Sequence, residues 1–156
     1  MRETDMLNRR LFIVGLMVTF AGCASAANAV VVHVYKTATC GCCAEWVVHL
    51  RSHGFEVLVK DVEDVTPVAE QLGVPSNLRS CHTALVSGYF VEGHVPSADI
   101  RKLLKEKPKA IGIAVPGMPA GSPGMDLVGQ SEAYNTMLVD RRGGVRLFVA
   151  HSGNRS

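Results

Sequence analysis

The sequence has little excess charge of either sign. Its 156 residues include 16 basic and 14 acidic side chains, which gives a net charge of +2. Removal of an N-terminal signal at residues 1–26 would leave 13 basic and 12 acidic side chains, and a net charge of +1. Nucleic-acid binding depends on a basic surface that neutralises phosphates. The composition therefore gives no support for a nucleic-acid partner.

The chain also lacks an apolar run long enough for a comfortable membrane span. The apolar segment at residues 11–21 falls short of the roughly 20 residues that a spanning helix needs. Arg9 and Arg10 precede it and small residues follow it, which is the layout of a secretory signal peptide. We therefore expect residues 1–26 to be removed on export. No repeat, low-complexity tract or linker divides residues 27–156, so we expect them to form one domain.

The sequence offers two alternatives to cleavage after Ala26. Cleavage could follow Ala29 in place of Ala26. The sequence FAGC would instead allow lipidation of Cys23, and only this route would attach the protein to a membrane. Each route exports the domain and leaves four further cysteines, which are Cys40, Cys42, Cys43 and Cys81. Clustered thiols in an exported protein are either oxidised or occupied by a ligand.

Hydrophobic periodicity predicts a mixed α/β fold. Residues 30–36 and 55–62 are short β-branched runs typical of buried strands. Between them lies an apolar stripe with helical spacing, formed by Cys43, Trp46, Val47 and Leu50. Gly54 is placed to end this helix.

The next segment predicts a short helix, a hairpin and a longer helix. Thr66 is expected to cap the short helix, which ends before Gly73, and Ser97 to cap the helix at residues 98–107. The hairpin turns at Ser87 and Gly88. The resulting order β-α-β-α-β-β-α, with a parallel start and an antiparallel hairpin, is that of the thioredoxin-like fold. Beyond it we expect an elaboration with a strand at 110–115, a Gly/Pro-rich loop at 116–126 and a strand pair at 134–140 and 145–151.

Three cysteines, Cys40, Cys42 and Cys43, occupy four positions at the start of the first predicted helix. A helix N-terminus stabilises thiolate over thiol, so we expect it to lower the pKa of these thiols and of Cys81, the fourth cysteine at this point. In a thioredoxin-like fold the loop before the third strand passes close to this point and normally carries a cis-proline. Here Cys81 and His82 stand there instead. Four converging thiols predict a soft metal site suited to Cu(I), with Zn(II) as a less favoured occupant.

Two other uses of these cysteines stay open. Cys40 and Cys43 form a C-x-x-C pair, so the chain could be a thiol–disulfide oxidoreductase with Cys40 as the attacking and Cys43 as the resolving thiol. Alternatively, two disulfides could staple a small exported domain. Adjacent Cys42 and Cys43 disfavour such staples, because neighbouring residues seldom pair with each other. A disulfide catalyst needs only two thiols, so the surplus favours metal binding.

The sequence resembles the periplasmic copper-resistance family called CopG over nearly the whole mature chain. The resemblance rests on CGCC at residues 40–43, SCHTA at 80–84, VEGHVP at 91–96 and VPGMPAGSPGM at 115–125. It implies copper bound as a multinuclear, thiolate-bridged site by Cys40, Cys42, Cys43 and Cys81. It also implies a role in surviving excess copper in the periplasm, by binding Cu(I), passing it to other copper-handling proteins or changing its oxidation state. The residues alone do not decide whether the protein is an enzyme.

Further candidates surround this set. His82 and His94 could ligate the metal or orient its ligands, whereas a loop histidine can also simply fix the backbone. His49 and His53 have the i, i+4 spacing of helical zinc ligands, but we interpret them as a solvated face. Met118 and Met125 bracket the Gly/Pro-rich loop, which we expect to be a rigid lid over or beside the thiols more than a source of thioether ligands. Trp46 is expected to pack in the core.

Overall fold

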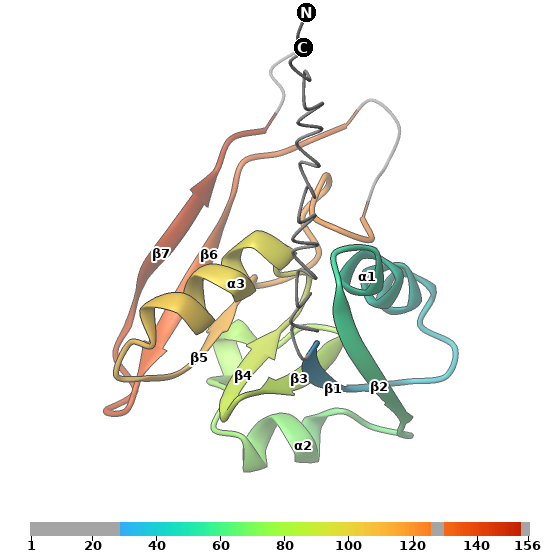
Figure 1. Ribbon diagram of the computed structural model, residues 1–156, viewed down its shortest axis with the longest axis horizontal. Coiled ribbons are helices and arrows are strands. Elements are labelled where there is room, and N and C mark those ends of the chain that lie inside the picture. The colour runs from blue at the N-terminus through green and yellow to red at the C-terminus, as the bar shows by residue number, and fades with distance from the viewer. Residues whose placement is uncertain (1–28, 126–129, 154–156) are drawn as a thin grey trace, which may run out of the picture.

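The computed structural model describes residues 29–125 and 130–153. Within these residues the chain has a mixed α/β fold with three α-helices, one short 3-10 helix and seven strands (Figure 1). The elements in chain order are β1 (Val30–Lys36), α1 (Gly41–Ser52), β2 (Phe55–Asp61), α2 (Thr66–Gln71), η1 (Ser76–Leu78), β3 (His82–Val86), β4 (Tyr89–Glu92), α3 (Ser97–Glu106), β5 (Ala110–Ala114), β6 (Tyr134–Asp140) and β7 (Val145–His151). The expected signal peptide and Cys23 lie outside the described residues.

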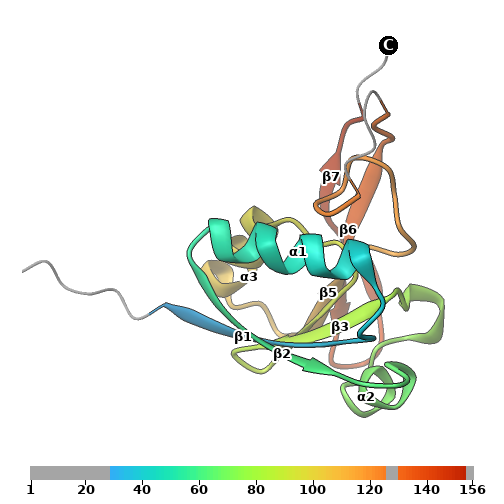
Figure 2. The ribbon, with the colours of Figure 1, turned by 90° about the vertical axis from the view of Figure 1, so that its right-hand side faces the viewer.

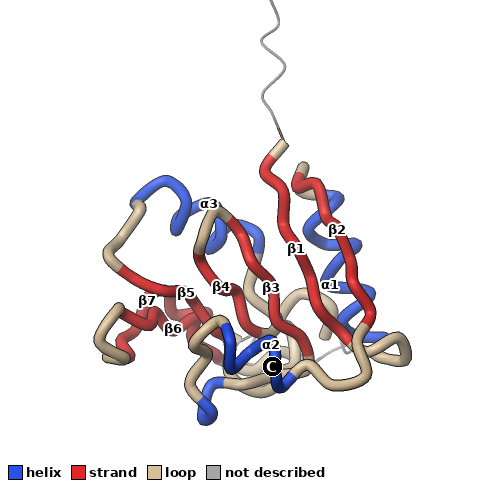
Figure 3. The backbone as a smooth tube through the Cα atoms, turned by 90° about the horizontal axis from the view of Figure 1, so that it is seen from below, coloured by secondary structure: helices blue, strands red, loops and turns tan. Residues whose placement is uncertain are grey.

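All seven strands belong to one sheet in the order β2-β1-β3-β4-β5-β6-β7 (Figure 3). Strand β1 is parallel to β2 and antiparallel to β3, β3 is antiparallel to β4, and β4 is parallel to β5. Helices α1 and α3 lie on one face of the sheet and α2 on the other (Figure 2). The element order predicted from the sequence, β-α-β-α-β-β-α, is confirmed for β1 through α3.

Helix α1 packs through the stripe that its sequence predicts. Its buried residues are Cys43, Trp46, Val47 and Leu50. Three of them, Trp46, Val47 and Leu50, join the main hydrophobic core with Val32 and Val34 of β1. The helix is followed by Gly54, whose positive φ of 79° reverses the chain into β2 at little steric cost. The burial of this stripe fixes which side of α1 faces the sheet, and with it the inward side of Cys43 in the first turn.

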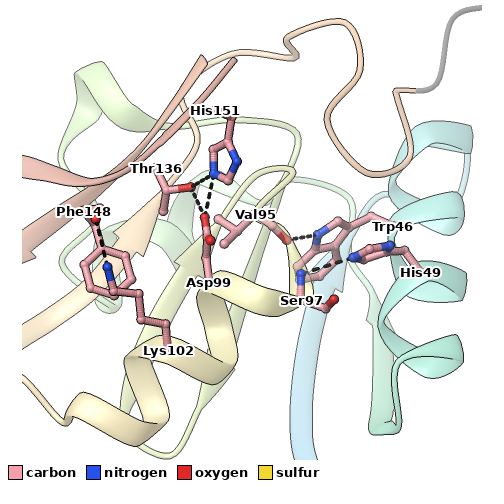
Figure 4. Close-up of polar contacts among 9 residues, drawn as sticks. All are labelled: Trp46, His49, Val95, Ser97, Asp99, Lys102, Thr136, Phe148 and His151. Atoms are coloured by element: carbon pink, nitrogen blue, oxygen red, sulfur yellow. Dashed lines mark hydrogen bonds and ion pairs between the residues drawn. The ribbon is translucent and has the colours of Figure 1, made fainter. Parts of the chain in front are cut away.

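Two predicted helix caps are wrong. Thr66 is the first residue of α2 and makes no capping bond with its side chain; instead its N–H donates to Asp64 Oδ1 at 2.8 Å. Ser97 is the first residue of α3, and its N–H donates to Nε2 of His49 at 3.1 Å (Figure 4). His49 is half-buried, so the expected solvated face holds only for the exposed His53. The N-terminus of α3 is therefore satisfied from a neighbouring element, α1, and that of α2 by a residue just before it.

The expected C-terminal elaboration is present and continues the sheet. Strand β5 pairs with β4 on one side and with β6 on the other, and β6 and β7 form the last antiparallel pair. A buried carboxylate ties this pair to α3, because Asp99 Oδ2 accepts from Thr136 Oγ1 at 2.5 Å and from His151 Nε2 at 2.8 Å (Figure 4). None of the helices in the described ranges is long and apolar enough to cross a membrane.

Candidate metal centre

The centre begins where β1 leads into α1. Cys40 precedes the helix in an extended conformation and occupies the N-cap position, while Cys42 and Cys43 lie in its first turn. Cys43 is fully buried on the core-facing stripe, whereas Cys40 and Cys42 are half-buried. All three cysteines therefore lie at the N-terminus of α1, with only Cys43 on its core-facing stripe.

Strand register brings the fourth cysteine to this point. The last residue of β1, Lys36, pairs with the first residue of β3, His82. Cys81 stands immediately before that pair, so it lies beside the loop that carries the other cysteines. The structure thus brings together Cys81 and residues 40–43, as the sequence predicts.

The sulfur atoms are close but not equivalent. Cys40 and Cys43 form a disulfide, and Cys42 and Cys81 are free thiols. The Cys42 sulfur lies 3.5 Å from Cys40 Sγ and 4.0 Å from Cys81 Sγ. Cys43 Sγ lies 3.5 Å from the carbonyl oxygen of Cys81. The fold therefore clusters four sulfurs, two of which must be reduced before all four can act as thiolate ligands.

His94 reaches the cluster from the end of the hairpin. Thr83 pairs with Glu92 in the β3–β4 ladder, which places the residues just after β4 beside those just before β3. His94 Nε2 lies 3.2 Å from Cys81 Sγ, and its Nδ1 is 2.8 Å from the carbonyl oxygen of Pro123. That oxygen can only accept, so Nδ1 carries the proton and the lone pair of Nε2 faces the sulfur. This fixed tautomer is the one that a metal ligand requires.

His82 lies deeper in the same cluster. Its ring is fully buried between Trp46, at a centroid distance of 4.4 Å, and His94, at 5.0 Å. Nδ1 lies 3.4 Å from Cys81 Sγ, and Nε2 has no hydrogen-bond partner among the described residues. Burial lowers the pKa of His82 to about 3, with His94 adding to the effect, and burial also lowers the pKa of His94. Both rings are therefore neutral at neutral pH and able to donate lone pairs.

Cys81 differs from the expectation of a lowered thiol pKa. Burial, followed by the nearby Cys42, raises the pKa of Cys81 to about 11. The prediction that the helix N-terminus lowers the pKa of every cysteine in the cluster is therefore wrong for Cys81, which stands before a strand and faces another sulfur. At neutral pH Cys81 is a thiol, and a metal ion must displace its proton.

Two overlapping groups of side chains have the geometry to hold a metal ion. Each offers ligand atoms that all lie within 4.8 Å of one another. One group is Cys40, Cys42, Cys43 and Cys81, and the other is Cys81, His82 and His94. Cys81 belongs to both and joins the sulfur-rich side to the imidazole side. Soft sulfur and borderline nitrogen donors suit Cu(I) and Zn(II) better than hard cations.

The Gly/Pro-rich loop packs against the centre, in agreement with the expected lid. Besides the bond from His94 to Pro123, Ser80 Oγ donates to the Gly117 carbonyl at 2.7 Å. Gly124 lies so close to α1 that an added Cβ would stand 2.7 Å from the Cys42 carbonyl oxygen. The side chain of Met118 is 54% exposed. The loop is thus anchored to several parts of the centre.

Sequence reasoning missed one buried acidic side chain at the centre. Glu92 is fully buried at the end of β4, and burial raises its pKa to about 7. Its carboxylate accepts from Ser80 N–H and from Thr83 Oγ1, each at 2.6 Å. The available signal was a glutamate at the end of an otherwise apolar strand, because an acidic residue is seldom buried without a specific partner.

Comparison with known proteins gives two further findings. Residues 78–125 match a family described as a protein of unknown function, DUF411. Two solved structures, both titled copper resistance protein CopG, are similar to this chain with 42% sequence identity and a TM-score of 0.76. Form 2 matches over 79% of this chain and 98% of its own, and Form 1 over 80% and 99%. No curated protein sequence matches the chain.

Proposed function

We propose that this chain, which belongs to the CopG family of copper-resistance proteins, binds Cu(I) in its cysteine cluster and so contributes to copper resistance or handling. The proposed ligands are Cys40, Cys42, Cys43 and Cys81, with His82 and His94 as further ligands or as groups that orient the sulfurs. The observation that carries the proposal is the position of Cys81 Sγ, 4.0 Å from Cys42 Sγ and 3.2 Å from His94 Nε2.

The donor set supports Cu(I) over other cargo. Thiolates are soft donors that favour Cu(I), and Zn(II) is the less favoured alternative for the same atoms. Four sulfurs within 4.8 Å of one another are close enough for one thiolate to serve more than one ion, which supports a multinuclear site. The buried, neutral imidazoles would add ligands without adding charge.

Full occupancy requires chemical reduction first. The Cys40–Cys43 disulfide must take up two electrons, together with two protons, to give two thiols. Copper then replaces the thiol protons, so binding releases protons to solvent. A thiol reductant or phosphine supplies the electrons in vitro and is itself oxidised.

We also propose the fold of the copper-binding domain and the compartment in which it binds copper. The strand order β2-β1-β3-β4, with β1 and β2 parallel and β3 and β4 antiparallel, supports a thioredoxin-like core in a domain of residues 27–156. The N-terminal signal pattern supports export to the periplasm, with membrane attachment only if Cys23 is lipidated. Copper would then be exchanged with other periplasmic copper-handling proteins.

Anaerobic Cu(I) titration of the reduced domain, followed by metal analysis, tests this proposal. Cys42→Ser and Cys81→Ser should each lower the copper bound per chain. A Ser52→Ala variant is the matched control, because Ser52 is exposed at the far end of α1. Unchanged copper content in both cysteine variants would refute the four-sulfur site.

The observed disulfide favours a second candidate, a thiol–disulfide oxidoreductase that uses Cys40 and Cys43. In that reaction two electrons pass from the Cys40–Cys43 dithiol to a substrate disulfide, which leaves as two thiols. Such an enzyme should reduce the disulfides of insulin and keep this activity in Cys81→Ser. Loss of copper in Cys81→Ser without insulin reduction by the parent protein would favour the copper proposal.

A further inference from the structure

The segment that carries Cys81 is not held by the sheet. Strand β3 begins at His82, so Ser80 and Cys81 lie outside its ladder. No cis-proline restrains the segment, since none occurs in the described ranges. The position of the Cys81 sulfur therefore depends on contacts outside the sheet, including those made by the residues on either side of it.

Glu92 makes those contacts from a fixed position. Its backbone belongs to β4, and its carbonyl oxygen accepts from Val115 N–H at 3.0 Å. Its side chain has no exposed surface. One carboxylate oxygen accepts from Ser80 N–H and the other from Thr83 Oγ1, both at 2.6 Å. These partners bracket Cys81 and His82, so the carboxylate spans the pair of residues that face the cluster.

We call the two hydrogen bonds that Glu92 accepts from Ser80 and Thr83 the Glu92 bracket. From it we infer that Glu92 is a positioning residue for the metal centre, because it keeps Cys81 within reach of Cys42 and His94. The inference rests on the proposed function where it concerns copper, but the arrangement of the thiol itself can be tested without metal. Ser80 Oγ also donates to Gly117, so the segment keeps one restraint when Glu92 is replaced.

Hydrogen bonding, and not an ion pair, is the means of this positioning. Among the described residues, no lysine or arginine nitrogen lies within ion-pair distance of the Glu92 carboxylate, and nearby Arg79 pairs with Glu70 at 3.1 Å. Burying a carboxylate is costly unless it is hydrogen-bonded, and here both oxygens are. A glutamine can keep both contacts, because its oxygen accepts from Ser80 N–H and its amide donates to the Thr83 hydroxyl oxygen. Glutamine should therefore substitute for Glu92, whereas alanine should not.

Cys81 is well placed to report the loss of this bracket. A pocket of about 250 Å³ is lined by both Cys81 and Glu92, so a small reagent has a route to the sulfur once the segment loosens. The experiment is iodoacetamide alkylation of the reduced, metal-free protein, with the rate at each cysteine measured by peptide mass spectrometry. Cu(I) competition against a chromophoric chelator is measured on the same samples.

The variants are Glu92→Ala, Glu92→Gln and Thr83→Val, with Asp99→Ala as the matched control. Asp99 is also a buried carboxylate with two side-chain donors, but its partners are Thr136 and His151 (Figure 4). We expect Glu92→Ala to raise the Cys81 alkylation rate about tenfold and to weaken Cu(I) binding about tenfold, with the Cys42 rate within about twofold of the parent. Glu92→Gln should stay within about threefold in both measurements, and Thr83→Val should raise the Cys81 rate about threefold.

Several outcomes would overturn the inference. These are an unchanged Cys81 rate in Glu92→Ala, equal acceleration of all four cysteines in Glu92→Ala and Asp99→Ala, or a Glu92→Gln variant as impaired as Glu92→Ala. If Glu92→Ala does not fold, Thr83→Val decides the matter, because an unchanged Cys81 rate there would also refute the bracket. If the parent protein binds no Cu(I) while the Cys81-selective acceleration is present, the proposed function fails and the positioning role holds.

Discussion

The raised pKa of Cys81 predicts an unusual proton release when copper binds. A thiol with a pKa of about 11 keeps its proton at about pH 9.5 in nearly every molecule. With the ordinary value of 9.0 it would keep the proton in only about a quarter of them. Copper binding to the sulfur displaces whatever proton remains. Cys81 should therefore contribute about one proton per bound cluster at about pH 9.5, where an unperturbed thiol would contribute about 0.25.

The sign of the pH dependence follows from the same shift. Because the pKa is raised, the proton is held in competition with copper at all pH values below about 11. Through Cys81 alone, the apparent Cu(I) affinity should rise up to about tenfold for each pH unit in that range. Reduction of Cys40 and Cys43 adds two thiols to the neighbourhood of Cys81. Any negative charge on them would raise the Cys81 pKa further, so reduction does not reverse the prediction.

The assay is an anaerobic Cu(I) titration of reduced protein in weak buffer, with released protons counted by an indicator dye. The Cys81 contribution is the difference between the parent protein and Cys81→Ser, each saturated with Cu(I). We predict a difference of about one proton at about pH 7.5 and again at about pH 9.5. If the difference in released protons is about one at about pH 7.5 but only about 0.25 at about pH 9.5, the assignment of a raised pKa to the buried Cys81 thiol is refuted.

Three further predictions address the surroundings of the cluster. His94→Ala should weaken Cu(I) binding by about tenfold in a chelator competition, because it removes the imidazole that faces the Cys81 sulfur, and an unchanged affinity would exclude a role for this ring. Gly124→Ala should lower the free energy of unfolding in urea by about 2–4 kcal/mol, since its Cβ would collide with the backbone of α1. Gly143→Ala is its control, having a similar φ of 83° but open space at the Cβ, so equal losses would contradict the crowding argument. Asp99→Asn should cost about 1–3 kcal/mol in the same assay and leave the copper content unchanged, because it weakens only the bonds between α3 and the β6–β7 pair.

Elements whose signals are local were predictable from the sequence. The stripe of Cys43, Trp46, Val47 and Leu50 gave the buried face of α1, and the β-branched run at residues 30–36 gave β1. The approach of Cys81 to the other cysteines was also predicted, because in a thioredoxin-like fold the loop before the third strand passes close to the start of the first helix. The path of this loop places the sulfur of Cys81 close to the sulfurs of residues 40–43.

Contacts between elements distant in sequence were not predictable in the same way. Ser97 was expected to cap α3 with its own hydroxyl, but His49 of α1 supplies the acceptor from 48 residues away. The bracket made by Glu92 depends on hairpin register and on burial, neither of which composition reports. The raised pKa of Cys81 has the same origin, since desolvation depends on what packs around the thiol and not on the CGCC motif.

X-ray absorption at the copper edge tests the central claim most directly, through the atoms bound to Cu(I) in the reduced, loaded protein. The account predicts a first shell dominated by sulfur, with a lower sulfur contribution in Cys81→Ser. A shell of nitrogen and oxygen alone, or a sulfur shell identical in the parent protein and Cys81→Ser, would contradict it.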